Sequence, residues 1–107
     1  MYVKDIFLAA QKVRRYSEGM TKTQFVGDSR TQDAVLRQLS VIGEAAASIS
    51  DEFKMTIDDL QWRGVVAFRN LVIHHYWQVD LDRVWGIAKK DVPDLVRKLK
   101  RAQRDTP

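Results

Sequence analysis

The segment that could do chemistry spans residues 68–77 and reads FRNLVIHHYW. It places Arg69 and His74 among apolar residues, although an unpaired arginine is costly to bury. A guanidinium binds phosphate through two hydrogen bonds and stabilises charge that builds up on the phosphate oxygens. An imidazole, with an ordinary pKa of about 6.5, takes up or releases a proton near neutral pH. Such a pair suits a reaction at a phosphodiester.

Together these groups suit the cleavage of RNA by its own 2′-hydroxyl, a reaction that needs no metal ion. The imidazole of His74 would help to deprotonate the ribose 2′-hydroxyl, and the guanidinium of Arg69 would stabilise the transition state at phosphorus. The products would be a 2′,3′-cyclic phosphate and a 5′-hydroxyl end. A structural interpretation stays open, because Arg69 could instead pair with Glu44 in the stretch IGEAAAS, with His74 as an ordinary helix-end residue. The pattern R-x4-H alone is too weak to choose.

The spacing of these residues limits how they meet. Arg69 and His74 are five residues apart, which is about 140° around an ideal α-helix. Asn70 and His74 are four apart and would share a helix face. The spacing therefore predicts that the helix ends near His74 or Tyr76, or that the partner groups meet across an interface between two molecules.

The elements that must position this segment are predicted to be helices only. Five glycines and two prolines interrupt the chain, and apolar residues recur at helical spacing and do not alternate. We expect an all-α, four- or five-helix up-and-down bundle, because the predicted loops are short. The clearest stripe lies within Ser29–Ser50, where Arg37, Gln38 and Ser48 should point away from the core. The four predicted apolar stripes are Ile6, Ala10, Val13 and Met20; Val35, Leu39, Ile42, Ala46 and Ile49; Trp62, Val65, Phe68 and Val72; and Leu81, Val84, Trp85, Ala88 and Val92.

Capping residues set the predicted ends of these helices. Gly19 is a candidate C-cap, Ser29 with Gln32 has the spacing of a capping box, and Asp80 can cap the fourth helix. Thr56 and Asp59 have a similar spacing before the third helix. Pro93 either kinks the fourth helix or begins a new helix with Asp91 as its N-cap. Residues 20–28, 51–55 and 76–79 are predicted as connections.

Composition excludes several classes of protein. The 107 residues predict one domain, residues 1–107, and the lack of cysteine excludes disulfides and thiolate metal sites. The longest apolar run, Ile6–Ala10, is far shorter than the roughly 20 residues that cross a bilayer. No signal peptide is visible, and we expect a cytoplasmic protein without membrane contact. The net charge of +4 is modest; residues 97–104, RKLKRAQR, hold five basic residues that either solvate a helix end or attract phosphate.

The segment from Arg69 to Tyr76 resembles the R-x4-H-x-Y signature of HEPN-domain toxins of the HepT type. The resemblance covers nearly the whole chain, through KDIFLAAQKVRRYSEGM, TQDAVLRQLSVIGEAA, WRGVVAFRN and VDLDRVWGIAKKDVPDL in the expected order. It implies a helical-bundle ribonuclease that needs no metal or other cofactor and is the toxin of a toxin–antitoxin pair. Arg69 and His74 would be its catalytic residues, Asn70 would support them, and the site would form in a homodimer where two motifs face each other.

The resemblance also implies a protein partner. The antitoxin of such pairs resembles a minimal nucleotidyltransferase, and its target would be Tyr76, which would receive AMP from ATP. The adenylate would place negative charge and bulk two residues from His74 and would exclude RNA. The alternatives are a non-catalytic module that docks beside a nucleotidyltransferase and holds its substrate, and a structural protein whose Arg69 forms an internal salt bridge. His75, between the motif histidine and tyrosine, departs from the usual small or polar residue and is predicted to be a bystander.

Overall fold

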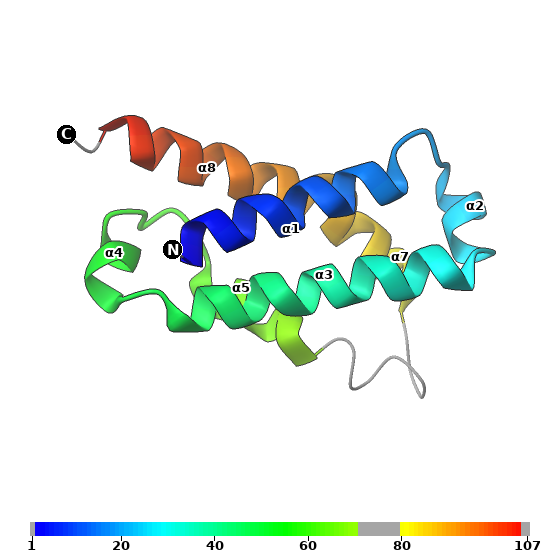
Figure 1. Ribbon diagram of the computed structural model, residues 1–107, viewed down its shortest axis with the longest axis horizontal. Coiled ribbons are helices and arrows are strands. Elements are labelled where there is room, and N and C mark those ends of the chain that lie inside the picture. The colour runs from blue at the N-terminus through cyan, green and yellow to red at the C-terminus, as the bar shows by residue number, and fades with distance from the viewer. Residues whose placement is uncertain (1, 71–79, 106–107) are drawn as a thin grey trace.

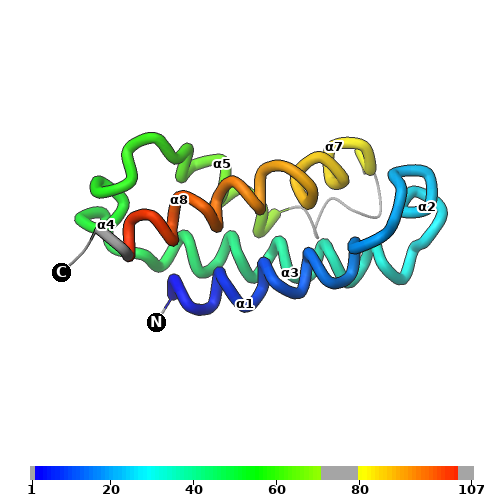
Figure 2. The backbone as a smooth tube through the Cα atoms, turned by 90° about the horizontal axis from the view of Figure 1, so that it is seen from above, coloured from blue at the N-terminus to red at the C-terminus, as the bar shows by residue number. Residues whose placement is uncertain are grey.

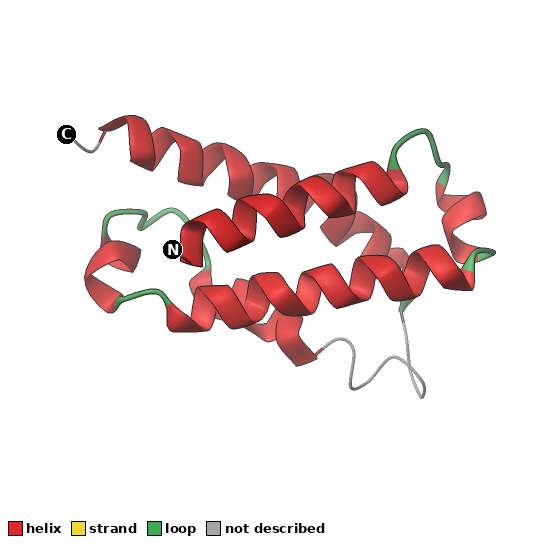
Figure 3. Cartoon of the chain, viewed as in Figure 1, coloured by secondary structure: helices red, strands yellow, loops and turns green. Residues whose placement is uncertain are grey.

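The computed structural model describes residues 2–70 and 80–105, and this part of the chain contains helices and no strands (Figures 1 and 3). The predicted all-α bundle is therefore confirmed. Its α-helices are α1 (Tyr2–Ser17), α2 (Lys22–Val26), α3 (Ser29–Ser48), α4 (Asp51–Met55), α5 (Trp62–Val66), α7 (Leu81–Gly86) and α8 (Val92–Asp105). A 3-10 turn, η1 (Ala67–Asn70), follows α5, and a π-helical turn, η2 (Ile87–Asp91), joins α7 to α8.

Three long elements form the frame of the bundle. Helices α1 and α3 run antiparallel and pack along most of their length, and α8 returns along α1 (Figures 1 and 2). The described chain is elongated, with extents of 45 × 27 × 21 Å. Helices α4 and α5 bring the chain back beneath α3, so that η1 lies on the side of α3 that faces away from α1 (Figure 1). The rigid pair α1–α3 thus carries the segment in which Arg69 lies.

The core is built from the apolar stripes that helical periodicity predicts. Residues of the α1 and α3 stripes are almost fully covered, and α8 adds Leu95 and Leu99 from the other side. Burying each such leucine or isoleucine side chain stabilises the folded state by about 1.5–3 kcal/mol. The predicted stripe residues that are buried include Ile6, Ala10, Val13, Val35, Leu39, Ile42, Ala46, Ile49, Val65, Phe68, Val84, Ala88 and Val92. The prediction for Val72 concerns a residue outside the described ranges.

Two predicted connections contain short helices. Within residues 20–28, the side chain of Thr21 accepts a hydrogen bond from the Gln24 amide at 3.1 Å, and the Thr21 amide donates to Gln24 Oε1 at 2.9 Å. This capping box starts α2, which inserts the fully buried Phe25 into the core. Within residues 51–55, Ser50 caps α4 by accepting from the Phe53 amide at 3.2 Å. Predicting these segments as connections was wrong, because local caps sustain a single turn that apolar periodicity does not reveal.

Two predicted caps were also wrong. The N-cap of α3 is Asp28 and not Ser29, since both carboxylate oxygens of Asp28 accept hydrogen bonds from Thr31, at 3.0 and 2.8 Å. These bonds lower the pKa of Asp28. Thr56 does not start a helix; it ends α4, where its hydroxyl donates to the Phe53 carbonyl at 2.6 Å. Helix α5 begins later, at Trp62.

The last helical segment runs from α7 through η2 into α8 without an intervening loop. Asp80 caps α7 as predicted, accepting from the Arg83 amide at 3.1 Å. Of the two interpretations for Pro93, the new helix behind Asp91 is wrong, because Asp91 belongs to the π turn and Pro93 lies in the first turn of α8. The wider π turn relieves the clash between a proline ring and the preceding turn. Gly19 has φ +76°, as expected of a glycine C-cap.

Candidate active site

Arg69 and Asn70 end the turn η1, and both side chains are exposed. Residues 71–79 follow, and the predicted catalytic His74, the modified Tyr76 and the bystander His75 lie outside the described residues. The structure therefore places one half of the predicted catalytic pair. Its position depends on the neighbouring apolar residues Val65 and Phe68, which are only 6% and 8% exposed, where α5 and η1 pack against α3.

The backbone of Arg69 lies against a glycine of α3. A Cβ atom at Gly43 would lie 2.4 Å from the Arg69 amide nitrogen, 2.9 Å from the Val66 carbonyl oxygen and 3.0 Å from Arg69 Cβ. Real side chains do not approach a backbone this closely, so only glycine permits the contact. Ser40, one turn earlier in α3, donates from its hydroxyl to the Arg69 carbonyl at 3.5 Å, a long and weak hydrogen bond. Close packing, more than hydrogen bonding, fixes the backbone at Arg69.

The guanidinium of Arg69 forms no ion pair with any residue in the described ranges. Glu44 is itself exposed, and the Glu44 group engaged by Ser48 is the backbone carbonyl, which accepts from the Ser48 hydroxyl at 3.1 Å. The internal Arg69–Glu44 salt bridge that the sequence left open is therefore absent from this part of the chain. Arg69 is exposed, its backbone is held in place, and no described residue compensates its charge. Such an arginine is suited to binding an anion.

The predicted angular offset between Arg69 and His74 assumed a continuous α-helix. Residues 67–70 form instead a 3-10 turn, which has about three residues per turn, so the 140° offset does not apply at Arg69. Asn70 shares this turn with Arg69 and is exposed beside it.

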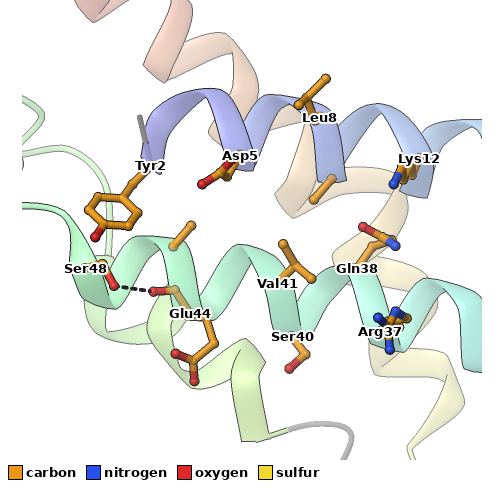
Figure 4. A pocket seen from close by; sticks show the side chains of 12 residues that line it. Tyr2, Asp5, Leu8, Lys12, Arg37, Gln38, Ser40, Val41, Glu44 and Ser48 are labelled. Carbon is orange, nitrogen blue, oxygen red and sulfur yellow. Dashed lines mark hydrogen bonds between the residues drawn. The ribbon is translucent and has the colours of Figure 1, made fainter.

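A groove of about 520 Å³ runs between α1 and α3, and its wall includes Ser40 (Figure 4). Gln38 faces this groove from α3 and is only 8% exposed, so the prediction that it points away from the core was wrong. Arg37 and Ser48 are exposed, as expected.

A second attachment holds the segment that leads to η1. The indole nitrogen of Trp62 donates to the carbonyls of Lys54 and Ile57, both at 3.2 Å, which ties α5 to the end of α4. Asp59 then reaches α8, where its carboxylate lies 2.9 Å from the Arg101 guanidinium and 3.9 Å from the Lys98 ammonium. The hydrogen bond from Arg101 is the largest cause that lowers the pKa of Asp59.

Sequence reasoning missed Gly43, Ser40 and Asp59 as residues that position the site. For Gly43 a signal existed, because a glycine inside a strongly periodic helix often marks a close backbone approach. For Asp59 there was none, since its partners lie 39 and 42 residues away. In residues 2–70 and 80–105, no three potential metal ligands gather, and no helix is long and apolar enough to cross a membrane.

The family model for HepT-like ribonucleases matches residues 6–102 of this chain. The chain belongs to the HepT-like ribonuclease family. The protein named "Probable ribonuclease HepT" of Thermococcus cleftensis is 32% identical to it, over 96% of this chain and 94% of that protein. "Putative RNase MJ1380" of Methanocaldococcus jannaschii is 30% identical over 92% of this chain and 90% of that protein. No solved structure gives a significant match.

Membership of the HepT-like family confirms the predicted resemblance and the predicted class of enzyme, a ribonuclease. The matched range includes Arg69 and Asn70, and also the positions of His74 and Tyr76. The roles of these four residues in this HepT-like chain stay predictions.

Proposed function

We propose that this HepT-like chain is the toxin of a toxin–antitoxin pair, a cytoplasmic, metal-independent endoribonuclease that uses Arg69 and His74. The observation that carries the proposal is the Arg69 guanidinium, exposed and without an ion pair to the described residues, on a backbone held against Gly43. Five residues later the chain supplies His74, within the range that the ribonuclease family model matches.

The proposed reaction is attack of a ribose 2′-oxygen on the adjacent phosphorus. His74 accepts the 2′-hydroxyl proton, and the bond from phosphorus to the 5′-oxygen breaks as the 2′,3′-cyclic phosphate forms. Arg69 binds the non-bridging oxygens, and Asn70 supports the phosphate as a hydrogen-bond donor. One imidazole cannot act as base and acid in the same instant. A homodimer supplies a second His74, which protonates the leaving 5′-oxygen.

Neutralisation is proposed to occur at Tyr76, by a nucleotidyltransferase-type antitoxin. The phenolic oxygen attacks the α-phosphorus of ATP, pyrophosphate leaves, and AMP stays linked to Tyr76 through a phosphodiester. That phosphodiester brings a negative charge to the neighbourhood of the Arg69 guanidinium, where it competes with the RNA backbone. The test is incubation with ATP and the partner: a gain in mass by one or more AMP groups is expected, and Tyr76→Phe should abolish it.

The deciding experiment for cleavage uses purified protein and end-labelled RNA in the presence of EDTA. Cleavage should yield 2′,3′-cyclic phosphate ends, and both Arg69→Ala and His74→Ala should abolish it without changing the circular dichroism spectrum. Arg63→Ala is the matched control, because Arg63 is an exposed arginine on α5 and should leave cleavage unchanged. Full activity of His74→Ala would show that the assignment of the base is wrong.

A docking module without catalysis predicts partner or nucleotide binding and no cut RNA. Expression of the chain without its partner separates the two functions in cells, because only a toxin arrests growth. Normal growth with well-folded protein would contradict the toxin role, even if cleavage in vitro is observed.

A further inference from the structure

A second groove, of about 820 Å³, runs between α1 and the segment formed by η2 and α8. Helices α1 and α8 lie side by side and run in opposite directions (Figures 1 and 2). Where they approach, the groove is lined by the small residues Ala10 and Ser17 of α1 and Ala88 of η2. These side chains are too short to fill the space between the two helices, so the groove stays open.

Much of the lining of this α1–α8 groove is apolar. Val92 and Ala88 are almost fully buried, and the partly buried Phe7 and Val96 pack against the same core. Pro93 adds an exposed apolar ring. An apolar groove between two helices is the kind of surface that accepts the apolar face of a third helix.

Four residues with charged side chains line the groove, and all are basic: Arg14, Lys89, Arg97 and Lys100. Two of them have partners within the fold. The Lys89 ammonium donates to the Ser17 carbonyl at 3.2 Å and lies 5.1 Å from the centre of the Trp85 ring. The Arg97 guanidinium pairs with Asp94. Only the other two are therefore available to an occupant of the groove.

These two available cations are Arg14 and Lys100. Both are exposed, and neither forms an ion pair with a residue in the described ranges. Because α1 and α8 are antiparallel, the two cations lie toward opposite ends of the groove. Counting along both helices from the hydrogen bond between Lys89 and Ser17, they are separated by roughly two helical turns. A complementary occupant carries carboxylates with the same separation.

RNA fits this groove poorly, although residues 97–104 are rich in cations. Arg97, Lys98 and Arg101 each have an acidic partner, so α8 offers no continuous track of free positive charge. Phe7, the one aromatic residue among the described lining residues, is partly buried and presents no open ring on which a base could stack. A phosphate backbone also gains nothing from an apolar lining.

An acidic amphipathic helix matches both the lining and the charges. Its apolar stripe covers the lining, and its carboxylates pair with Arg14 and Lys100. A second copy of this chain does not supply such a helix, since none of α1, α3 and α8 has more acidic than basic residues. We propose that the α1–α8 groove binds an acidic amphipathic helix of a different protein.

This groove does not include the candidate catalytic arginine. The turn η1 packs against α3, and Arg69 is not among the residues that line the groove. A helix bound between α1 and α8 therefore does not cover the Arg69 guanidinium, and the inference stands independently of the proposed ribonuclease mechanism.

The experiment uses a fluorescein-labelled helical peptide of about 18 residues as the probe and the full chain as the receptor. The peptide carries leucines at i, i+3, i+4 and i+7 and glutamates beside them, two of which are seven residues apart. Fluorescence anisotropy should show saturable binding. Arg14→Glu with Lys100→Glu should weaken it at least tenfold, because repulsion replaces attraction at both ends of the groove.

Two further peptides separate the contributions of charge and apolar surface. A peptide with lysine in place of each glutamate should not bind, since the groove offers no free carboxylate among its described residues. A peptide of unchanged composition but shuffled order has no apolar stripe and should bind at least tenfold more weakly.

The matched control variant is Lys12→Glu with Lys90→Glu. It makes the same change in net charge at two exposed cations, one on α1 and one on η2, that do not line the groove. The affinity for the acidic peptide should change by less than about threefold, and circular dichroism should show both variants folded. If charge reversal unfolds the chain, Arg14→Gln with Lys100→Gln replaces it, with an expected loss of about threefold or more.

Three results would each overturn the proposal: no saturable binding of the acidic peptide, equal binding of the shuffled peptide, or an equal loss of affinity in the groove variant and its control. RNA is tested with a 2′-O-methyl oligonucleotide, which lacks the attacking hydroxyl and stays intact. If it displaces the peptide and loses affinity in the groove variant alone, RNA is the occupant and the proposal is wrong. Every readout is binding, so the result does not depend on RNA cleavage.

Discussion

The segment from α4 to η1 is attached to the bundle in two contrasting ways. Its far end, at Asp59, reaches α8 through an ion pair in which the Asp59 and Arg101 side chains are 46% and 51% exposed. Its near end, at Arg69, lies backbone to backbone against Gly43. An exposed ion pair tolerates small displacements and contributes little, whereas a close-packed contact between two backbones does not yield.

The contrast shows where the precision of the candidate site originates. Arg69 owes its position to a residue without a side chain, on a helix that belongs to the core of the molecule. The polar attachment at Asp59 restrains the same segment from a distance. Disturbing the near contact should therefore affect catalysis most, and disturbing the far contact should affect it least.

Gly43→Ala is expected to have the largest effect. Its Cβ would overlap the Arg69 amide nitrogen at 2.4 Å, so η1 must move away from α3. The better helix propensity of alanine, worth up to about 1 kcal/mol, should be outweighed by overpacking of about 1–3 kcal/mol. We expect RNA cleavage to fall by roughly tenfold or more, since small misplacements of a catalytic group are costly. Initial rates and urea denaturation measure the two effects.

The control for this prediction is Gly64→Ala, in the same segment. A Cβ at Gly64 meets no atom within 4 Å, so the substitution should leave cleavage unchanged and stabilise α5 by about 0.5–1 kcal/mol. If Gly43→Ala behaves like Gly64→Ala, the close contact does not position Arg69.

The sequence predicted the frame of this molecule better than its connections. Val35, Leu39 and Ile42 were predicted as core residues because burial follows the helical period over a long segment, and apolar residue types recur with that period in the sequence. The turn α2 was missed although the T-x-x-Q signal of its cap was present at Thr21, because five residues are too short for periodicity to register.

The candidate site shows a second limit of sequence reasoning. Arg69 was selected by its chemistry, and the family match supports that choice. The contact of Gly43 with Arg69 depends on how α3 and η1 approach each other, across 26 residues of sequence. The exposure of Arg69 and the lack of an ion pair with Glu44 likewise depend on tertiary packing, which local spacing does not encode.

Trp62→Phe should have an intermediate effect. It keeps the ring that packs on the core but removes the N–H group that donates to the carbonyls of Lys54 and Ile57. Loss of these bonds should lower the free energy of unfolding by about 1 kcal/mol, measured by urea denaturation. Cleavage should change by less than in Gly43→Ala, because the contact of η1 with α3 is retained. If cleavage fell as much as in Gly43→Ala while the free energy of unfolding changed little, Trp62 would have a more direct role in catalysis than its contacts indicate.

Asp59→Asn should have the smallest effect at neutral pH, where salt already screens the exposed pair with Arg101. Its signature is expected in acid. The folded state lowers the pKa of Asp59 below its ordinary 3.8, chiefly through the hydrogen bond from Arg101. The stabilisation is therefore fully present above that ordinary value and is lost as the pH falls through the lower folded pKa.

Urea denaturation between about pH 5 and pH 2 should show a shallower loss of stability in Asp59→Asn than in the unmodified chain. Asp28, whose pKa is also lowered, should account for part of the slope that remains, and Asp28→Asn combined with Asp59→Asn should flatten it further. An unchanged slope in Asp59→Asn would mean that the Asp59–Arg101 pair is not formed in solution.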